Sequence, residues 1–243
     1  MIAASVLAGA MLSAGFSVPQ LFLAIGLANL VVGAYIFLLV PEYLLRFVAF
    51  VLSHTIYRLK LKGAEHIPTE GAVLLVCNHV SFIDAVLLMA VSPRPVRFIM
   101  DHRIFRIPVL GWLFKLVKAI PVASQKEDPA AYAKAFEAAS QVLREGDVLA
   151  IFPEGGITRD GTLQPFKAGL MKILETDPVP VVPMALKNLW GSFFSRAEGG
   201  TAMSRPFRRG LFSRVEVVVG EPVPPQQVSP EGLRQRVAAL LEG

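Results

Sequence analysis

The chain has 243 residues, of which 53% are hydrophobic and 18% charged, and its formal net charge at pH 7 is +5. This apolar content, with a charged share below the roughly 25% of an average globular protein, excludes a disordered chain and a collagen-like repeat. The chain contains one cysteine, which excludes a disulfide scaffold and a cysteine-based metal site.

The apolar residues are concentrated at the N-terminus. Residues 1–41 carry no charged side chain, and residues 20–40 form an apolar run whose only polar interruption after Gln20 is Asn29. As a helix this run is about 32 Å long, close to the roughly 30 Å hydrocarbon core of a bilayer. We therefore predict a membrane-spanning helix there, with a buried core helix as the alternative. Residues 1–16 are short for a span and leave open a partner helix, a re-entrant segment or part of a larger membrane domain.

Pro41 ends the run, and residues 42–60 continue with apolar side chains at helical spacing and scattered charges. This pattern is typical of an amphipathic helix at a membrane surface. All nearby basic residues follow the long run and none precedes it, namely Arg46, Arg58, Lys60 and Lys62. By the positive-inside rule, the rest of the chain faces the cytoplasm. We expect residues 1–60 to anchor the protein and residues 61–243 to form a cytoplasmic domain.

Beyond residue 63, short apolar runs alternate with helical stretches. Strands are predicted at residues 72–77, 96–100, 148–152, 179–186 and 215–219. One helix is predicted from Asp128-Pro129 to Gly146, and another after Ser229-Pro230. The alternation favours an α/β fold with a mostly parallel sheet flanked by helices. In such sheets, functional groups gather beyond the carboxyl ends of the strands.

The segment Asn-His-Val-Ser-Phe-Ile-Asp at residues 78–84 directly follows the first of these strands. If Ser81 caps the next helix, Asp84 lies in its first turn and its carboxylate reaches back to the His79 imidazole. A carboxylate on one ring nitrogen fixes the tautomer and leaves the other nitrogen free to accept a proton. The pair would then be a general base for a hydroxyl nucleophile. The alternative is a capping box, in which Asp84 only satisfies backbone N–H groups.

A second segment, Phe-Pro-Glu-Gly-Gly-Ile-Thr-Arg at residues 152–159, follows the strand at 148–152. Glu154 with Gly155 and Gly156 places a carboxylate and accessible backbone N–H groups in a tight turn. Such a turn can bind a polyol hydroxyl and an anionic head group together. Arg159 and Lys167 supply cations for a phosphate. A plain β-to-α turn with a solvent-exposed arginine is the alternative.

Three blocks resemble the glycerolipid acyltransferases in order and spacing: Asn-His-Val-Ser-Phe-Ile-Asp at 78–84, Phe-Pro-Glu-Gly at 152–155, and Val-Pro-Val-Val-Pro-Met at 179–184. These enzymes esterify lysophosphatidate and other lysophospholipids, and the resemblance covers roughly residues 60–225. It implies His79 as the catalytic base and Asp84 as its partner. It also implies an acceptor site formed by Glu154, Gly155, Gly156, Thr158, Arg159 and Lys167.

Within the family, the chain is most similar to bacterial 2-acylglycerophosphoethanolamine acyltransferases, a domain often fused to a lysophospholipid transporter and an acyl-carrier-protein ligase. The likeness rests on residues 78–84, on Pro-Glu-Gly-x-Ile-Thr at 153–158 and on residues 163–169. The apolar N-terminus then corresponds either to the last transporter helix of such a fusion or to the two-helix docking motif of stand-alone lysophosphatidate acyltransferases.

The chain departs from the family pattern at two places. The common block reads Phe-Pro-Glu-Gly-Thr-Arg, whereas Gly156-Ile157 intervenes here before Thr158-Arg159. The block at 120–126 lacks the family's usual arginine, and only Lys126 is available to take a similar part. A site with fewer arginines favours a lysophospholipid with a diester phosphate over dianionic lysophosphatidate.

A basic run near the C-terminal third bears on possible partners. The run comprises Arg196, Arg205, Arg208, Arg209 and Arg214. Glu198 is the only acidic residue within it. Such a run can meet anionic lipid or an acidic carrier protein. A solvated loop is the alternative.

Together these features predict an acyltransferase that moves a fatty acyl group from an acyl-carrier-protein or coenzyme A thioester to the free hydroxyl of a lysophospholipid. Membrane lipid is the expected partner, with acyl-carrier protein as a second candidate. We expect no metal or other cofactor, no nucleic acid, and a bacterial inner-membrane location. The alternatives are a lysophosphatidate acyltransferase, a thioesterase or lysophospholipase, and a non-catalytic membrane adaptor. A hydrolase is disfavoured because the chain lacks a Gly-x-Ser-x-Gly elbow.

Overall fold

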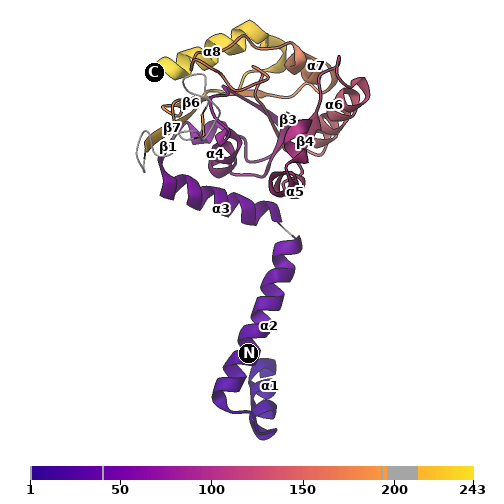
Figure 1. Ribbon diagram of the computed structural model, residues 1–243, viewed down its shortest axis with the longest axis vertical. Coiled ribbons are helices and arrows are strands. Elements are labelled where there is room, and N and C mark those ends of the chain that lie inside the picture. The colour runs from indigo at the N-terminus through magenta and orange to yellow at the C-terminus, as the bar shows by residue number, and fades with distance from the viewer. Residues whose placement is uncertain (1, 40, 193, 196–212) are drawn as a thin grey trace. The chain divides into compact units, whose positions relative to one another are not determined.

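The computed structural model of the chain describes residues 2–39, 41–192, 194–195 and 213–243 (Figure 1). The chain divides into two compact units, Met1–Leu44 and Leu45–Gly243. The first unit is helical, and the second contains all of the described strands.

The first unit consists of α1 (Ile2–Ser13), α2 (Val18–Leu39) and the beginning of α3 (Pro41–Ile56). Helices α1 and α2 contact each other. Helix α2 has 22 residues with a mean hydropathy of 2.3, and none of them is buried. Among the described helices it alone is long and apolar enough to cross a membrane, by length and composition. This matches the predicted apolar run and fits an association of the chain with a membrane.

The amphipathic helix expected over residues 42–60 ends earlier than predicted. Helix α3 stops at Ile56, and strand β1 (Tyr57–Lys62) follows it directly. Strand β1 pairs with a second strand in parallel, so residues 57–60 belong to the sheet and not to the anchoring helices. The reason is visible in the sequence: from Tyr57 onward basic and apolar side chains alternate with a period of two, which is a strand pattern.

In the described part of the second unit, seven strands form one sheet. Across the sheet they run in the order β1, β7 (Ser213–Val219), β6 (Val181–Lys187), β2 (Val73–Cys77), β5 (Val148–Ile151), β3 (Val96–Asp101) and β4 (Ile120–Val122). Neighbouring strands are parallel, except for the antiparallel pair β6 and β7. The predicted mostly parallel sheet is therefore confirmed.

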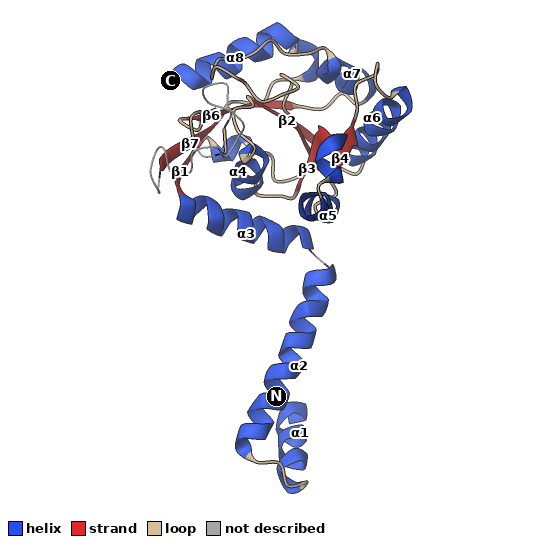
Figure 2. Ribbon diagram, in the orientation of Figure 1, coloured by secondary structure: helices blue, strands red, loops and turns tan. Residues whose placement is uncertain are grey.

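Helices cover both faces of this sheet (Figure 2). Helix α4 (Asp84–Val91) packs on one face. Helices α6 (Pro129–Arg144), α7 (Gly169–Thr176) and α8 (Pro230–Glu242) pack on the other. Strand β2 contributes Val73, Leu75 and Cys77 to the first face, and Leu74 and Val76 to the second. A parallel strand inside a sheet that helices cover on both faces is expected to be apolar on both faces, as β2 is.

The starts of two helices follow their predicted caps. Asp128 accepts a hydrogen bond from the Ala131 N–H at the start of α6, and Ser229 accepts one from Gly232 at the start of α8. A proline follows each cap, as the sequence predicted. The remaining elements among the described residues are α5 (Pro108–Leu116) and the 3₁₀ turns η1 (Ala64–His66), η2 (His102–Arg106) and η4 (Pro225–Gln227).

Strands β2, β3, β5 and β6 point in one direction, so their carboxyl ends meet at one edge of the sheet. The segments that follow these ends are residues 78–83, the turn η2, residues 152–168 and residues 188–192. We call this edge the carboxyl edge. Both segments with candidate functional residues begin there.

Two glycines with left-handed backbones test how tightly β1 and β7 are joined. Gly63 has φ 71° and Gly71 has φ 75°. A Cβ on Gly63 would overlap the carbonyl oxygen of Val219, whereas a Cβ on Gly71 would meet no atom within 4 Å. We expect Gly71→Ala to cost only the left-handed backbone penalty, about 1–2 kcal/mol. Gly63→Ala should destabilise the domain by clearly more, as measured by denaturant unfolding in detergent. Equal losses would contradict the close packing at Gly63.

Candidate active site

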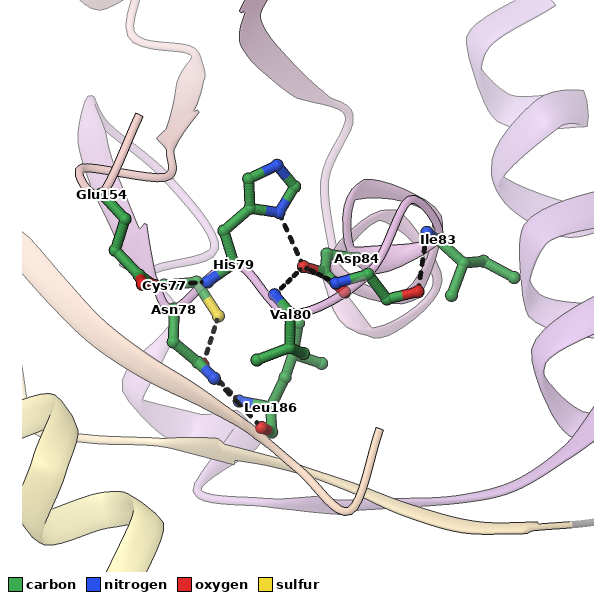
Figure 3. Close-up of polar contacts among 9 residues, drawn as sticks. Cys77, Asn78, His79, Val80, Ile83, Asp84, Glu154 and Leu186 are labelled. Atoms are coloured by element: carbon green, nitrogen blue, oxygen red, sulfur yellow. Dashed lines mark hydrogen bonds and ion pairs between the residues drawn. The ribbon is translucent and has the colours of Figure 1, made fainter. Parts of the chain in front are cut away.

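His79 follows strand β2 at the carboxyl edge, and its imidazole is fixed by a buried carboxylate (Figure 3). The Nδ1 atom lies 2.7 Å from Oδ2 of Asp84. Because an ionised carboxylate only accepts hydrogen bonds, Nδ1 carries the proton and Nε2 presents its lone pair. The imidazole side chain is 21% exposed, and its other ring nitrogen, Nε2, points away from Asp84 (Figure 3). This is the arrangement of a general base.

Asp84 also satisfies the backbone around it. Its Oδ2 atom accepts the N–H groups of Val80 at 2.7 Å and Ser81 at 3.0 Å, in addition to the imidazole. The side chain is fully buried, which raises the pKa of the carboxyl, while the His79 and backbone donors act in the opposite direction. The imidazole contact and the backbone hydrogen bonds, which the sequence left as alternatives, therefore occur together in one carboxylate.

The start of α4 differs from the expected cap. Asp84 is the first residue of the helix, and its N-cap position is held by Ile83. Ser81 Oγ accepts a weak hydrogen bond from the Ile83 N–H at 3.4 Å, so it does not cap the helix in the predicted way. The helix therefore begins at Asp84 itself, and the carboxylate still faces the imidazole.

Asn78 joins the end of β2 to β6, a role that the sequence did not predict. Its side-chain Oδ1 accepts the Leu186 N–H at 2.7 Å, and its Nδ2 donates to the Leu186 carbonyl at 3.2 Å. The amide thus continues the β2–β6 ladder one step beyond Cys77. The sequence signal for this role was an asparagine placed immediately after a buried strand. The chain can then leave the sheet at His79 without breaking the pairing abruptly.

Glu154, in the turn that follows the neighbouring strand β5, holds the backbone of His79. Its Oε1 accepts the His79 N–H at 2.6 Å, and its Oε2 accepts the Gln164 N–H at 2.9 Å. Burial raises the pKa of this carboxyl, and the two backbone donors partly offset that effect. The Thr158 N–H completes the hold by donating to the His79 carbonyl at 2.9 Å. The sequence predicted Glu154 as a substrate ligand, and the structure gives both of its oxygens backbone partners.

Phe152 supports the imidazole from one side. The two rings stack with centroids 4.3 Å apart and an interplanar angle of 17°. Behind Phe152 lies Phe98 of β3, with ring centroids 6.4 Å apart. The imidazole is therefore held by a carboxylate at Nδ1 and by an aromatic face. The sequence analysis did not single out Phe152, although it directly precedes the Pro-Glu-Gly turn.

The Glu154-Gly155 turn carries an ammonium group. Gly155 has φ 70°, and a Cβ there would overlap Nζ of Lys167, so the lysine head group lies against the glycine. The Lys167 backbone N–H fixes this approach by donating to the Pro153 carbonyl at 2.9 Å. A Cβ on Gly156 would meet no atom within 4 Å. The turn is thus open to solvent and electropositive.

The remaining predicted site residues are less closely tied to His79. Thr158 is buried, and its hydroxyl donates to Asp160 at 2.9 Å, which stabilises the turn that follows. Arg159 and Lys126 are exposed, and their side chains make no hydrogen bond or ion pair with the described residues. The structure brings together His79, Asp84, Glu154, Gly155 and Lys167, and it does not bring Arg159 or Lys126 to them by any contact.

A pocket of about 220 Å³ adjoins the site and shares Asn78 and Glu154 with it. Its other lining residues include Thr162, Lys187 and Trp190. The indole Nε1 of Trp190 is buried and has no hydrogen-bond partner among the described residues.

Cys77, the last residue of β2, donates its thiol proton to Oδ1 of Asn78 at 3.5 Å. The Cys77 thiol is fully buried, and burial raises its pKa well above the usual value, so the thiolate form is disfavoured. In the described part of the chain, no group of three or more His, Cys, Asp or Glu residues has the geometry of a metal site.

Comparison with known proteins gives the chain a place among acyltransferases. It is 32% identical over 131 residues to the chloroplastic 1-acyl-sn-glycerol-3-phosphate acyltransferase BAT2 of Brassica napus, a match that covers 54% of this chain and 37% of that protein. The chain thus spans little more than a third of this curated relative. A Bacillus subtilis 1-acyl-sn-glycerol-3-phosphate acyltransferase is 23% identical over 184 residues, covering 75% of this chain and 82% of the relative.

The fold has a counterpart among solved structures. The crystal structure of the 1-acyl-sn-glycerophosphate (LPA) acyltransferase PlsC from Thermotoga maritima superposes with a TM-score of 0.58 and 24% identity. The match covers 83% of this chain and 78% of that one. The model of the Acyltransferase family matches residues 58–187, which include both blocks at the carboxyl edge. This chain therefore belongs to the acyltransferase family.

Proposed function

We propose that the protein transfers a fatty acyl group from a thioester to the free hydroxyl of a lysophospholipid. The observation that carries the proposal is the His79–Asp84 pair, in which one ring nitrogen is held at 2.7 Å by a buried carboxylate and the other is accessible. Relatives named 1-acyl-sn-glycerol-3-phosphate acyltransferases support the same class of acceptor.

In the proposed reaction, His79 Nε2 takes the proton of the acceptor hydroxyl as its oxygen attacks the thioester carbonyl. The C–O bond forms, the C–S bond then breaks, and the imidazolium returns its proton to the departing thiolate. Asp84 stabilises the imidazolium through Nδ1. Because the lipid hydroxyl is the nucleophile, the proposed reaction needs no acyl-enzyme intermediate. The buried Cys77 thiol therefore has no role in it.

The acceptor phosphate is assigned to the open turn at Gly155 and Gly156, where the Lys167 ammonium lies. The Gly155 N–H already donates to the Phe152 carbonyl at 3.0 Å, so the proposed ligands are the ammonium group and the exposed Gly156 backbone. Arg159 and Lys126 remain candidate contributors because both are exposed at the surface. Glu154 acts here mainly by fixing the His79 backbone, since both of its oxygens already accept N–H groups.

Two acceptors compete. A diester lysophospholipid, such as a 2-acylglycerophosphoethanolamine, is favoured because the 120–126 block has no arginine to bind a second phosphate charge. Lysophosphatidate is the alternative, and the names of the relatives favour it. We propose acyl-carrier protein or coenzyme A as the donor's carrier. Of the basic run considered as a carrier site, Arg196, Arg205, Arg208 and Arg209 lie outside the described residues.

We further propose that α2 spans a bacterial inner membrane and that the second unit faces the cytoplasm. The support is the length of α2 and the charge asymmetry around it. No charged residue precedes the helix, and basic residues follow it from Arg46 onward.

The defining experiment follows a radiolabelled acyl group from acyl-carrier protein or coenzyme A with purified protein in detergent. Label in phospholipid supports acyl transfer, and label in free fatty acid would show a hydrolase instead. Binding of lyso-lipid without turnover for any donor and acceptor would show a membrane adaptor. Comparing lysophosphatidylethanolamine with lysophosphatidate separates the two acceptors.

Asp84→Asn tests the His79–Asp84 pair. Asparagine retains one oxygen for the backbone N–H groups but cannot hold the Nδ1–H tautomer through a negative charge, so we expect kcat to fall by about 10²–10⁴-fold with the fold intact. The matched control is Asp128→Asn, where the side chain only caps α6 and asparagine caps equally well. If both variants kept wild-type kcat, Asp84 would be a cap alone.

Lys167→Ala tests the acceptor site. Losing one charge-assisted hydrogen bond costs about 1.5–3 kcal/mol, so the KM for lysophospholipid should rise roughly 10 to 150-fold. The KM for the acyl donor should stay unchanged. Lys134→Ala, which removes an exposed lysine from α6, serves as the control. A selective rise in donor KM would mean that the phosphate bound at Lys167 belongs to the carrier, and Arg159→Ala then tests the remaining cation.

A further inference from the structure

Helix α5 presents apolar side chains to solvent. Val109 is 74% exposed, Trp112 is 63% exposed, and Ile107, just before the helix, is 48% exposed. Positions 109 and 112 are three residues apart and therefore share one face of the helix. We call Ile107, Val109 and Trp112 the α5 apolar face. Single apolar residues scattered over a surface are ordinary, whereas a cluster of large exposed apolar side chains marks a docking surface.

The opposite side of α5 is fixed against the turn η2, so the orientation of the α5 apolar face is set by packing. The Phe105 and Phe114 rings lie 5.9 Å apart between centroids. A Cβ on Gly111 would overlap the carbonyl oxygen of Phe105, so only glycine allows this approach. The helix cannot roll to bury Trp112 without breaking these contacts.

The α5 apolar face belongs to the same edge of the sheet as His79. Turn η2 and α5 follow the carboxyl end of β3, which pairs with β5 in parallel. The Phe98 ring of β3 stacks toward Phe152, which in turn stacks on His79. Phe82, in the loop between His79 and Asp84, is a further exposed aromatic residue at this edge. An apolar surface therefore accompanies the candidate base.

Basic groups flank the α5 apolar face. Arg106 precedes it and Lys115 follows it; both are exposed, and their side chains have no acidic partner among the described residues. The neighbouring acidic groups are already engaged, Asp101 with Arg103 at 2.6 Å and Glu127 with His102 at 3.6 Å. Apolar and aromatic side chains flanked by unpaired cations match the boundary between acyl chains and anionic head groups.

We propose that α5 is a second membrane-docking element, with Trp112 and Val109 at the acyl boundary and Arg106 and Lys115 at the lipid phosphates. The occupant is argued from chain continuity: α2 has the length of a membrane span, and β1 begins 18 residues after it ends, so a bilayer is within reach of the domain. Docking there turns the carboxyl edge, which carries His79, toward the lipid. The proposal rests on α2 entering a bilayer and not on acyl transfer itself.

The test uses the two tryptophans of the chain as depth reporters. Full-length protein is reconstituted into vesicles of phosphatidylethanolamine and phosphatidylglycerol that contain phospholipid brominated near the head-group end of an acyl chain. In Trp190→Phe, Trp112 is the only fluorophore, and we expect roughly twofold or stronger quenching because interfacial helices lie about 5–10 Å into the boundary. In the matched Trp112→Phe variant, Trp190 packs against Gly161 and should show little quenching.

A second comparison does not depend on whether Trp190→Phe folds. The tryptophan emission of the wild-type protein should be quenched, and this quenching should disappear in Trp112→Phe. A double variant, Arg106→Glu with Lys115→Glu, should reduce Trp112 quenching in anionic vesicles. Unquenched Trp112 emission at a water-exposed wavelength would overturn the proposal. So would an emission shift that appears only on adding acyl-carrier protein or on raising the protein concentration, since either would assign the face to a protein partner. None of these readouts requires turnover, so they are separate from the acyl-transfer experiment.

Discussion

One buried oxygen organises the candidate active site. Oδ2 of Asp84 accepts the His79 Nδ1–H and the N–H groups of Val80 and Ser81. An ionised carboxylate inside a protein is costly unless such donors surround it. The loop after β2 therefore surrounds the Asp84 carboxylate with hydrogen-bond donors. The His79 imidazole is one of these donors, and its orientation is fixed for that reason. The tautomer of the base and the start of α4 thus have one physical cause.

Three adjacent strands share the task of holding His79. His79 lies just after the end of β2. Both polar groups of the Asn78 side-chain amide hydrogen-bond to β6, and Phe152 and Glu154 lie in the segment that follows β5. These contacts join positions that are more than 70 residues apart in sequence, so the site exists only in the folded sheet. The Lys167 ammonium at Gly155 is placed by the same turn that carries Glu154, which links the proposed phosphate site to the base.

The sequence predicted much of this arrangement, and the exceptions have physical reasons. Five strands were expected near their observed places because their apolar runs are continuous. Strand β4 was missed because it has three residues and contains Pro121, which an edge strand tolerates. Strand β1 was merged with the helix before it, since helical spacing ends only at Ile56. The backbone partners of Glu154 were not predictable, because a side chain's acceptors depend on which loops the sheet brings together.

The most direct test of the account is the protonation pattern of the His79 ring. Nitrogen NMR of protein labelled at its four histidines, with His79→Ala used for assignment, reports which ring nitrogen carries the proton. We predict that the neutral form of the His79 ring carries its proton on Nδ1, with a downfield, slowly exchanging signal that Asp84→Asn abolishes. A proton on Nε2, or a signal unchanged in Asp84→Asn, would contradict the claim that the buried carboxylate sets the base.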